Sequence, residues 1–321
     1  MTEIRIFGHL SIIGWLLLNI AMSNVNKWIF VQYNFNYPII LTTLHMITLF
    51  VVQSVIIRFT PFGAAYGDGD DRLKIPPHLS RKVSILSLAF CISIACGNIA
   101  LKYLYVSFLK MLMATSPAVT VAMSRLVFDY KHDLYVYYSM APLVVGGLIC
   151  TFGELNFSYI GFLAAVVALL LRSTKSILQG VLLKEEKLDS VRLLYHMSFP
   201  SMLILAACSC IFEYDAFFNG SLFSSVDLWH MIGLSCLCSV GYNTMNFVVT
   251  FFTSAVTLQV LGNVGIALNV IISVAIFQNK MSFLSVIGGV LTIVGVCMYD
   301  RALDIARYMR HRVSKSWGPI K

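Results

Sequence analysis

Apolar segments long enough to cross a bilayer follow one another along most of this chain. One of them runs from Phe157 to Leu183 and contains only a few polar residues. A transmembrane helix needs about 20 predominantly apolar residues, because each adds 1.5 Å across a hydrocarbon core about 30 Å thick. The 321 residues are 58% hydrophobic and only 12% charged, whereas a soluble domain is about 25% charged. The chain is therefore predicted to be an all-α membrane protein.

The apolar runs predict ten transmembrane helices in a single domain that takes up residues 1–321, with a basic tail at 302–321. The first run, Gly8 to Val31, is longer than the apolar part of a signal peptide and lacks an A-x-A cleavage pattern, so we expect it to remain as a helix. The expected helices cover residues 8–31, 37–58, 83–104, 107–127, 134–153, 157–181, 192–212, 228–250, 254–277 and 281–301.

Lysine and arginine are concentrated in alternate loops. With a cytosolic N-terminus, the cytosolic segments hold 17 of the 23 Lys and Arg residues, whereas the 213–227 loop has no cation. The positive-inside rule therefore predicts that both termini are cytosolic. The net charge of +8 then reflects topology and does not indicate nucleic-acid binding. Asn219 begins a sequon in what would be a lumenal loop, where glycosylation and chance occurrence both remain open.

The two halves of the chain resemble each other at an offset of 149 residues. Residues 126–131 (LVFDYK) align with 275–280 (AIFQNK), and Gly146 aligns with Gly295. An odd number of spans in each half inverts the second copy, as in many secondary transporters. The sequence thus predicts an inverted 5+5 repeat with copies at 8–153 and 157–301, although the biased composition of membrane helices also produces such matches.

Arg172 and Lys175 lie within an apolar run and share one helical face. A cation in a membrane span is costly, and it usually faces a polar cavity or a partner. Arg172 is about 22 Å along a helix that starts at Phe157, which places it in the cytosolic half, with Lys175 near the boundary. The two residues are expected to attract an anion, and the alternative is that both flank the span on its cytosolic side.

Further polar residues within the predicted spans mark the cavity in which a carrier of this kind binds its substrate. Lys27 and Lys110 have snorkelling to the lumenal surface as an alternative role, and the amides have helix packing. His45 fits a packed hydrogen-bonding residue better than a proton relay. The candidate binding residues in addition to Arg172 and Lys175 are Asn24, Lys27, His45, Lys110, Tyr242, Asn243, Asn246 and Asn263.

Enzyme chemistry is weakly supported by this sequence. It has no P-loop, no GxSxG and no HExxH motif, and its carboxylates lie almost wholly in loops. Paired intramembrane carboxylates for acid–base chemistry are therefore lacking. Two C-x-C pairs, Cys208 with Cys210 and Cys236 with Cys238, lie within apolar runs and fit buried small residues better than a metal site. We expect no enzyme activity and no cofactor.

Five stretches of the chain occur in the order found in one transporter family. They are Asn26–Phe30 (NKWIF), Phe35–His45 (FNYPIILTTLH), Ser116–Val121 (SPAVTV), Arg172–Leu183 (RSTKSILQGVLL) and Thr257–Asn263 (TLQVLGN). Together they resemble the triose-phosphate transporter family of the drug/metabolite transporter superfamily, nearest to the E-type members of solute carrier family 35 and their plant UDP-sugar relatives. The match extends over nearly the whole chain, and its motifs are specific to the family but not to a substrate.

The resemblance implies ten helices in an inverted repeat that works by alternating access. Nucleotide-sugar members of the family are Golgi or ER antiporters, and plastid members exchange phosphorylated sugars for phosphate. Lysines in the first, fourth and ninth helices help to hold the phosphates, and Lys27 matches the first of these. Two positions depart from the pattern, because Met113 and Gly265 stand where relatives commonly have lysine. Lys110 lies one turn before Met113 and could compensate in part.

We therefore expect an antiporter of the Golgi or ER that moves an anionic phosphorylated substrate, foremost a nucleotide sugar, against a counter-substrate. Its expected partners are this small molecule and membrane lipid, with no nucleic acid, and a homodimer is compatible with the sequence. The alternatives are a carrier of another phosphorylated metabolite or organic anion, and a membrane regulator that transports nothing.

Overall fold

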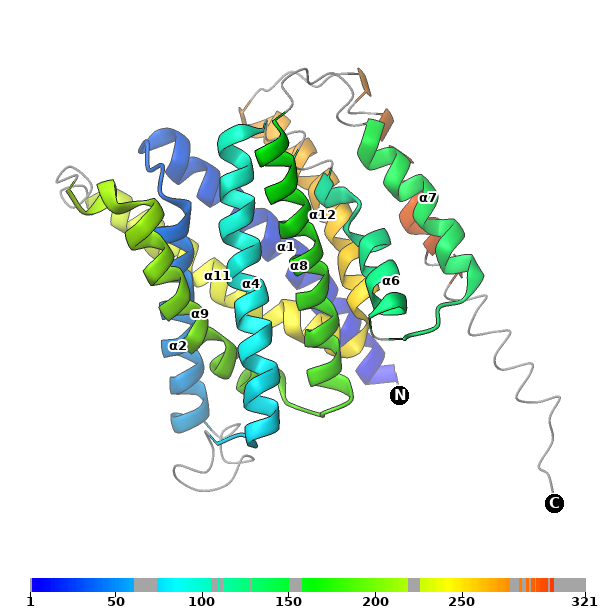
Figure 1. Ribbon diagram of the computed structural model, residues 1–321, viewed down its shortest axis with the longest axis horizontal. Helices are drawn as coiled ribbons and strands as arrows, with labels where there is room; N and C mark the ends of the chain where they lie inside the picture. Colours follow the sequence, from blue (N-terminus) through cyan, green and yellow to red (C-terminus); the bar gives the residue numbers. More distant parts are fainter. Residues whose placement is uncertain are drawn as a thin grey trace. The chain divides into compact units, whose positions relative to one another are not determined.

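A computed structural model describes residues 2–60, 74–104, 109, 112–127, 129–149, 158–218 and 226–277, and short pieces between 283 and 302. Within these ranges the regular structure is entirely helical, as the apolar runs predict (Figure 1). The helices are α1 (Thr2–Gln32), α2 (Pro38–Phe59), α4 (Pro77–Tyr103), α6 (Ser116–Leu126), α7 (Leu134–Ile149), α8 (Tyr159–Lys184), α9 (Ser190–Phe212), the short 3-10 helix η2 (Tyr214–Phe218), α11 (Val226–Phe252) and α12 (Ala255–Phe277).

Several of these helices have the length and composition of membrane spans. In the part of the chain that the structure describes, six are long and apolar enough: Gly8–Gln32, Pro38–Phe59, Pro77–Ala100, Tyr159–Lys184, Ser190–Phe212 and Val226–Phe252. Leu134–Gly146 and Ala255–Gly265 are shorter apolar helices. A run of such helices is the mark of a multi-pass membrane protein.

Several of the expected helices have other bounds in the structure, and α1 begins at Thr2 and α4 at Pro77, each six residues earlier than expected. The expected helix 107–127 is interrupted by a turn at Thr115, and α6 begins at Ser116 with Pro117 in its first turn. Proline is favoured there because it lacks the N–H that a first turn leaves unbonded. The helix expected to end at residue 181 continues to Lys184, which places Lys175 about 14 Å from its end.

The described chain divides into two compact units. Unit 1 comprises Met1–Ile99 and Thr174–Leu258, and unit 2 comprises Ala100–Ser173 and Gln259–Lys321. Each unit thus combines a segment from the first half of the sequence with one from the second half. Most of the candidate binding residues described below belong to unit 1.

Unit 1 is held together by two apolar clusters. In the larger one, buried side chains of α2, α4, α8, α9 and α11 meet, among them Leu49, Leu86, Leu182, Leu193 and Phe247. The smaller cluster joins the end of α1 and the start of α2 to η2 and the start of α11, around Ile29, Leu41 and Ile232. α1 packs along α11, and α2 packs along α9 (Figure 1).

The start of α2 is bonded by a side chain from far along the chain. Glu213, which follows α9 and is only 7% exposed, accepts hydrogen bonds from the backbone N–H groups of Ile39 and Ile40, each at 2.8 Å. Tyr37, the residue before α2, makes no side-chain capping bond. The N–H groups of a first helical turn lack intrahelical partners, so the Glu213 carboxylate takes the place of a local cap.

Unit 2 depends on a close approach at Gly295. A methyl group added there would lie 2.7 Å from Cγ of Leu143 in α7 and 2.8 Å from the backbone nitrogen of the same residue. Gly295→Ala is expected to destabilise the protein by about 1–3 kcal/mol, the usual cost of overpacking. Thermal unfolding in detergent measures this, with Gly262→Ala as control because a methyl group at Gly262 meets nothing within 4 Å. Equal melting temperatures for the two variants would contradict the prediction.

Candidate functional site

Polar side chains along α11 form three junctions with other helices of unit 1. The junctions centre on Ser235, on the pair Tyr242 and Thr244, and on Asn246. From Ser235 to Asn246 they extend over about 16 Å of the helix axis. Polar residues are rare in lipid-embedded helices and mark interhelical hydrogen bonding or a substrate path. In unit 1, α11 contributes a polar residue to each of the three junctions.

The first junction is a chain of three side chains from three helices. His45 of α2 bonds through Nε2 to the hydroxyl of Ser235, at 2.8 Å, and that hydroxyl donates to Oδ1 of Asn26 in α1. His45 is 5% exposed and Ser235 is fully buried, whereas Asn26 is half-buried. The structure therefore gives His45 a hydrogen-bonding position inside the helix packing.

The second junction contains two buried polar atoms without a hydrogen-bond partner. Trp15 of α1 stacks on Tyr242, with 6.0 Å between ring centroids, and its indole N–H is buried and unbonded. Gln53 of α2 donates to the hydroxyl of Thr244 at 3.2 Å, while its own carbonyl oxygen is buried without a partner. Trp15 and Gln53 were not among the residues expected from the sequence, although Gln53 stands out as an amide within an apolar run.

The third junction links α8 to α11. Gln179 donates to Oδ1 of Asn246 at 3.1 Å and to the hydroxyl of Thr250 at 2.8 Å. Gln179 and Thr250 are fully buried, and Asn246 is 7% exposed. The amide oxygen of Asn246 is therefore occupied, and its amide nitrogen remains the group that can donate to a ligand.

Lys175 lies one turn before Gln179 in α8 and, like Gln179, it lies beside α11. Its ammonium group is 5.1 Å from the ring centroid of Phe247 in α11 and 5.9 Å from that of Phe90 in α4. The faces of aromatic rings attract a cation through their quadrupole, so these rings hold the charge without neutralising it. Arg172, three residues earlier in α8, is exposed; the pair therefore differs in environment.

Three other candidates of unit 1 bond within their own helix or are only partly buried. Asn24 donates to the carbonyl of Ile20 at 2.8 Å, and Asn243 donates to the carbonyl of Ser239 at 2.8 Å. Lys27 is half-buried. Backbone bonds to the preceding turn are common for such short polar side chains, and they fix the orientation of both amides.

In unit 2, Asn263 of α12 is 2% exposed and donates to the carbonyl of Ala114 at 2.8 Å. Nearby, the hydroxyl of Ser116 donates to Oε1 of Gln259 at 3.1 Å. These bonds join α12 to the turn before Pro117, where the chain lacks a regular helical bond. The amide of Asn263 therefore has a partner within unit 2 in this structure. Lys110 and Asn219 lie outside the described residues.

Several cations gather where α8 and α11 end and where α4 and α9 begin. Lys82 bonds to Glu186, Lys184 to the carbonyl of Thr253, and Arg192 to the carbonyl of Lys74. The hydrogen bond from Lys82 lowers the pKa of the Glu186 carboxyl, and the charges of Lys82 and His78 lower it further. These cations link loops at one end of unit 1.

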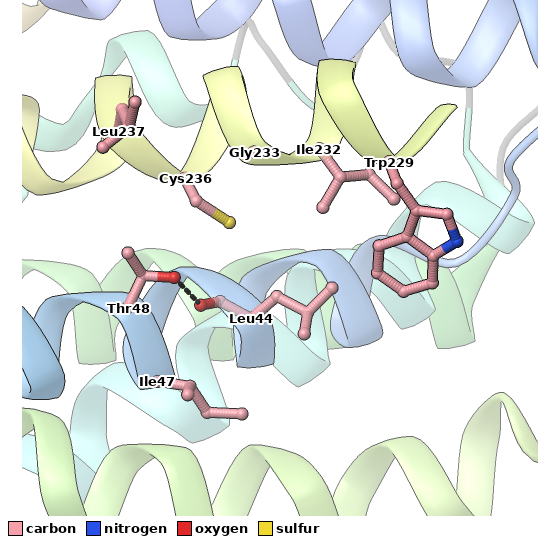
Figure 2. A pocket seen from close by; sticks show the side chains of 8 residues that line it. All are labelled: Leu44, Ile47, Thr48, Trp229, Ile232, Gly233, Cys236 and Leu237. Carbon is pink, nitrogen blue, oxygen red and sulfur yellow. Dashed lines mark hydrogen bonds between the residues drawn. The ribbon is translucent and has the colours of Figure 1, made fainter. Parts of the chain in front are cut away.

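A shallow groove of about 440 Å³ lies between α2 and α11 (Figure 2). Its lining is almost wholly apolar, with Leu44 and Ile47 on one side and Trp229, Ile232 and Leu237 on the other. The hydroxyl of Thr48 is turned to the carbonyl of Leu44, at 2.9 Å, and is thus already bonded. None of the side chains that line the groove is charged, so the groove does not suit an anion.

Comparison with known proteins decides the family. The sequence profile of the Triose-phosphate Transporter family matches residues 8–300. The chain belongs to this family. Among its relatives, solute carrier family 35 member E4 of Rattus norvegicus is 35% identical over 93% of this chain and 81% of its own length. A probable sugar phosphate/phosphate translocator of Arabidopsis thaliana is 34% identical over 94% of this chain and 97% of its own.

UDP-uronic acid transporter 1 of Arabidopsis thaliana is also 34% identical, over 92% of this chain and 94% of its own length. A solved structure titled "Crystal structure of protein" superposes with a TM-score of 0.69 over 94% of this chain and 98% of its own, at 15% identity, which shows a shared fold. The family assignment made from the five sequence stretches is confirmed. As a triose-phosphate transporter family member, the protein is a multi-pass membrane protein from a family of small-molecule transporters.

Proposed function

We propose that this family member is an antiporter that exchanges an anionic phosphorylated substrate, foremost a nucleotide sugar, for a counter-substrate across a Golgi or ER membrane. The observation that carries the proposal is the position of Lys175. It lies well inside a membrane-spanning helix, between two aromatic rings and one turn from the amide junction of Gln179 and Asn246. The free-energy cost of placing a cation within a membrane span is offset when the cation binds an anion.

The proposed mechanism is alternating access by ten helices arranged as an inverted 5+5 repeat, residues 8–153 and 157–301, with both termini cytosolic. The distribution of Lys and Arg supports this orientation. In this proposal four cations attract phosphate charge: Lys27, Lys110, Arg172 and Lys175. Arg172, which is exposed, attracts the anion as it arrives, and Lys175 binds it. Asn24, His45, Tyr242, Asn243, Asn246 and Asn263 bind or orient the ligand.

Relatives support an organophosphate as the substrate. One is named for the transport of a UDP-uronic acid, and another for the exchange of sugar phosphate and phosphate. A second candidate function is thus the exchange of a smaller phosphorylated metabolite. Met113 and Gly265 stand where the resemblance leads us to expect phosphate-binding lysines, so the site departs from that of a standard nucleotide-sugar carrier.

Exchange by purified protein in liposomes tests the proposal. Vesicles loaded with a nucleoside monophosphate, or with inorganic phosphate, are incubated with radiolabelled nucleotide sugars or sugar phosphates. We expect uptake that depends on the internal anion and that saturates with substrate. A folded, reconstituted protein that exchanges no nucleotide, sugar phosphate or phosphate would overturn the proposal in favour of a regulator without transport activity.

A further inference from the structure

The chain from His45 through Ser235 to Asn26 joins three helices of unit 1, and His45 and Ser235 are buried. Direction can be assigned by counting hydrogens. The Ser235 hydroxyl has one hydrogen, and it donates that hydrogen to Oδ1 of Asn26. Its contact with Nε2 of His45 must then be an acceptance, so Nε2 carries a hydrogen and the imidazole donates. The chain runs one way, from α2 through α11 to α1.

This direction determines which end of the Asn26 amide is left over. The carbonyl oxygen is taken by Ser235, so the amide nitrogen, with two N–H donors, lies on the other side of the group. Asn26 is half-buried, in contrast to the two residues behind it. The N–H donors of Asn26 are thus at the more accessible end of this hydrogen-bonded series, and His45 at its other end is buried among the helices.

The neighbour of Asn26 in α1 is Lys27, which is also half-buried. An oriented N–H donor is complementary to an oxyanion, since charge-assisted bonds to such oxygens are the stronger class. Lys27 adds positive charge to the same turn of α1, although consecutive side chains of a helix point about 100° apart. An amide held by only its own torsions would present oxygen or nitrogen with little preference. The bond from Ser235 removes that choice.

We propose that Asn26 is a substrate-contacting residue that donates from Nδ2 to an anionic oxygen of the substrate, and that His45 and Ser235 are positioning residues that fix the direction of this amide. The assignment rests on the proposed anion exchange. In this assignment His45 orients the ligand through Asn26 and does not relay a proton.

The sharpest test is Asn26→Asp, because it keeps the shape of the side chain and an oxygen facing Ser235 while replacing the donors with a negatively charged oxygen. In the liposome assay, with UDP-glucuronate or inorganic phosphate as the labelled anion, we expect the KM to rise by about tenfold to a hundredfold, the range for losing a bond to a charged group. Asn36→Asp adds the same charge at an exposed residue outside the helices and should leave KM unchanged.

Asn26→Ser is the companion variant, because it removes the distal donors without adding charge and remains informative if the Asp variant does not fold. We expect it also to raise KM by at least tenfold. His45→Phe should raise KM in the same way, and His45→Gln, which can again present an N–H, should restore it in part. In a double variant, His45→Phe should add little to Asn26→Ser, because both act through one amide.

The results distinguish a failure of the Asn26 assignment from a failure of the proposed function. If the wild-type protein exchanges anions and Asn26→Asp and Asn26→Ser both retain the wild-type KM, the assignment of Asn26 is wrong while the proposed function stands. If His45→Phe and Asn26→Ser have independent, multiplicative effects, His45 does not act through Asn26. If the wild type exchanges none of the anions, the proposed function fails and the assignment fails with it.

Discussion

Lys175→Met is expected to reduce anion exchange by about tenfold to a hundredfold, the loss associated with a hydrogen bond to a charged group, and to leave the fold intact. Methionine fills the space between Phe90 and Phe247 and makes favourable contacts with aromatic rings, but it has no charge for a phosphate. Because the variant removes a cation from a membrane span, the melting temperature should stay level or rise. A lower rate with equal or greater stability is the signature of a binding charge.

The measurement is initial exchange rate against substrate concentration in liposomes, together with thermal unfolding in detergent. Lys131→Met is the matched control, since Lys131 is exposed in the segment between α6 and α7 and its replacement should change neither quantity. Lys175→Arg retains the charge and should keep part of the activity, although a guanidinium is larger and fork-shaped. Wild-type exchange by Lys175→Met would remove Lys175 from the proposed site.

The helices of this protein follow closely from local sequence, because the lipid core requires every backbone group to be bonded within its own helix. The expected helix at 37–58 is observed as Pro38–Phe59, and the one at 228–250 as Val226–Phe252. The expected helix at 157–181 is observed as Tyr159–Lys184, so Lys175 lies about 14 Å from the helix end instead of about 9 Å.

The polar junctions are less accessible to prediction because they depend on how helices pack. His45 meets Ser235 across 190 positions of the chain, and Gln53 meets Thr244 across 191. Spacing along one helix gives the face that a residue occupies but not the partner opposite it. For the same reason, spacing placed Arg172 and Lys175 on one face but could not distinguish the exposed residue from the one beside two rings.

Glu213→Gln is expected to destabilise the protein, and by more than Gly295→Ala does. The Glu213 carboxylate receives two backbone N–H groups at 2.8 Å in a site that is 7% exposed. A glutamine of the same shape has only one acceptor oxygen, and its NH₂ group would face the second N–H. Losing a charged bond and leaving a buried donor unpaired costs about 2–4 kcal/mol, which corresponds to a fall of roughly 4–8 °C in melting temperature for a chain of this size.

Glu185→Gln makes the same chemical change at an exposed residue in the turn after α8, so it should shift the melting temperature by no more than about 1 °C. The negative carboxylate also suits the positive end of the α2 dipole, and a glutamine loses this contribution together with the second bond. Because Glu213 and α2 are 173 or more positions apart in sequence, the bond can stabilise α2 only once α9 has packed beside it. Equal melting temperatures for the two variants would mean that water or a neighbouring group caps α2 as well as Glu213 does.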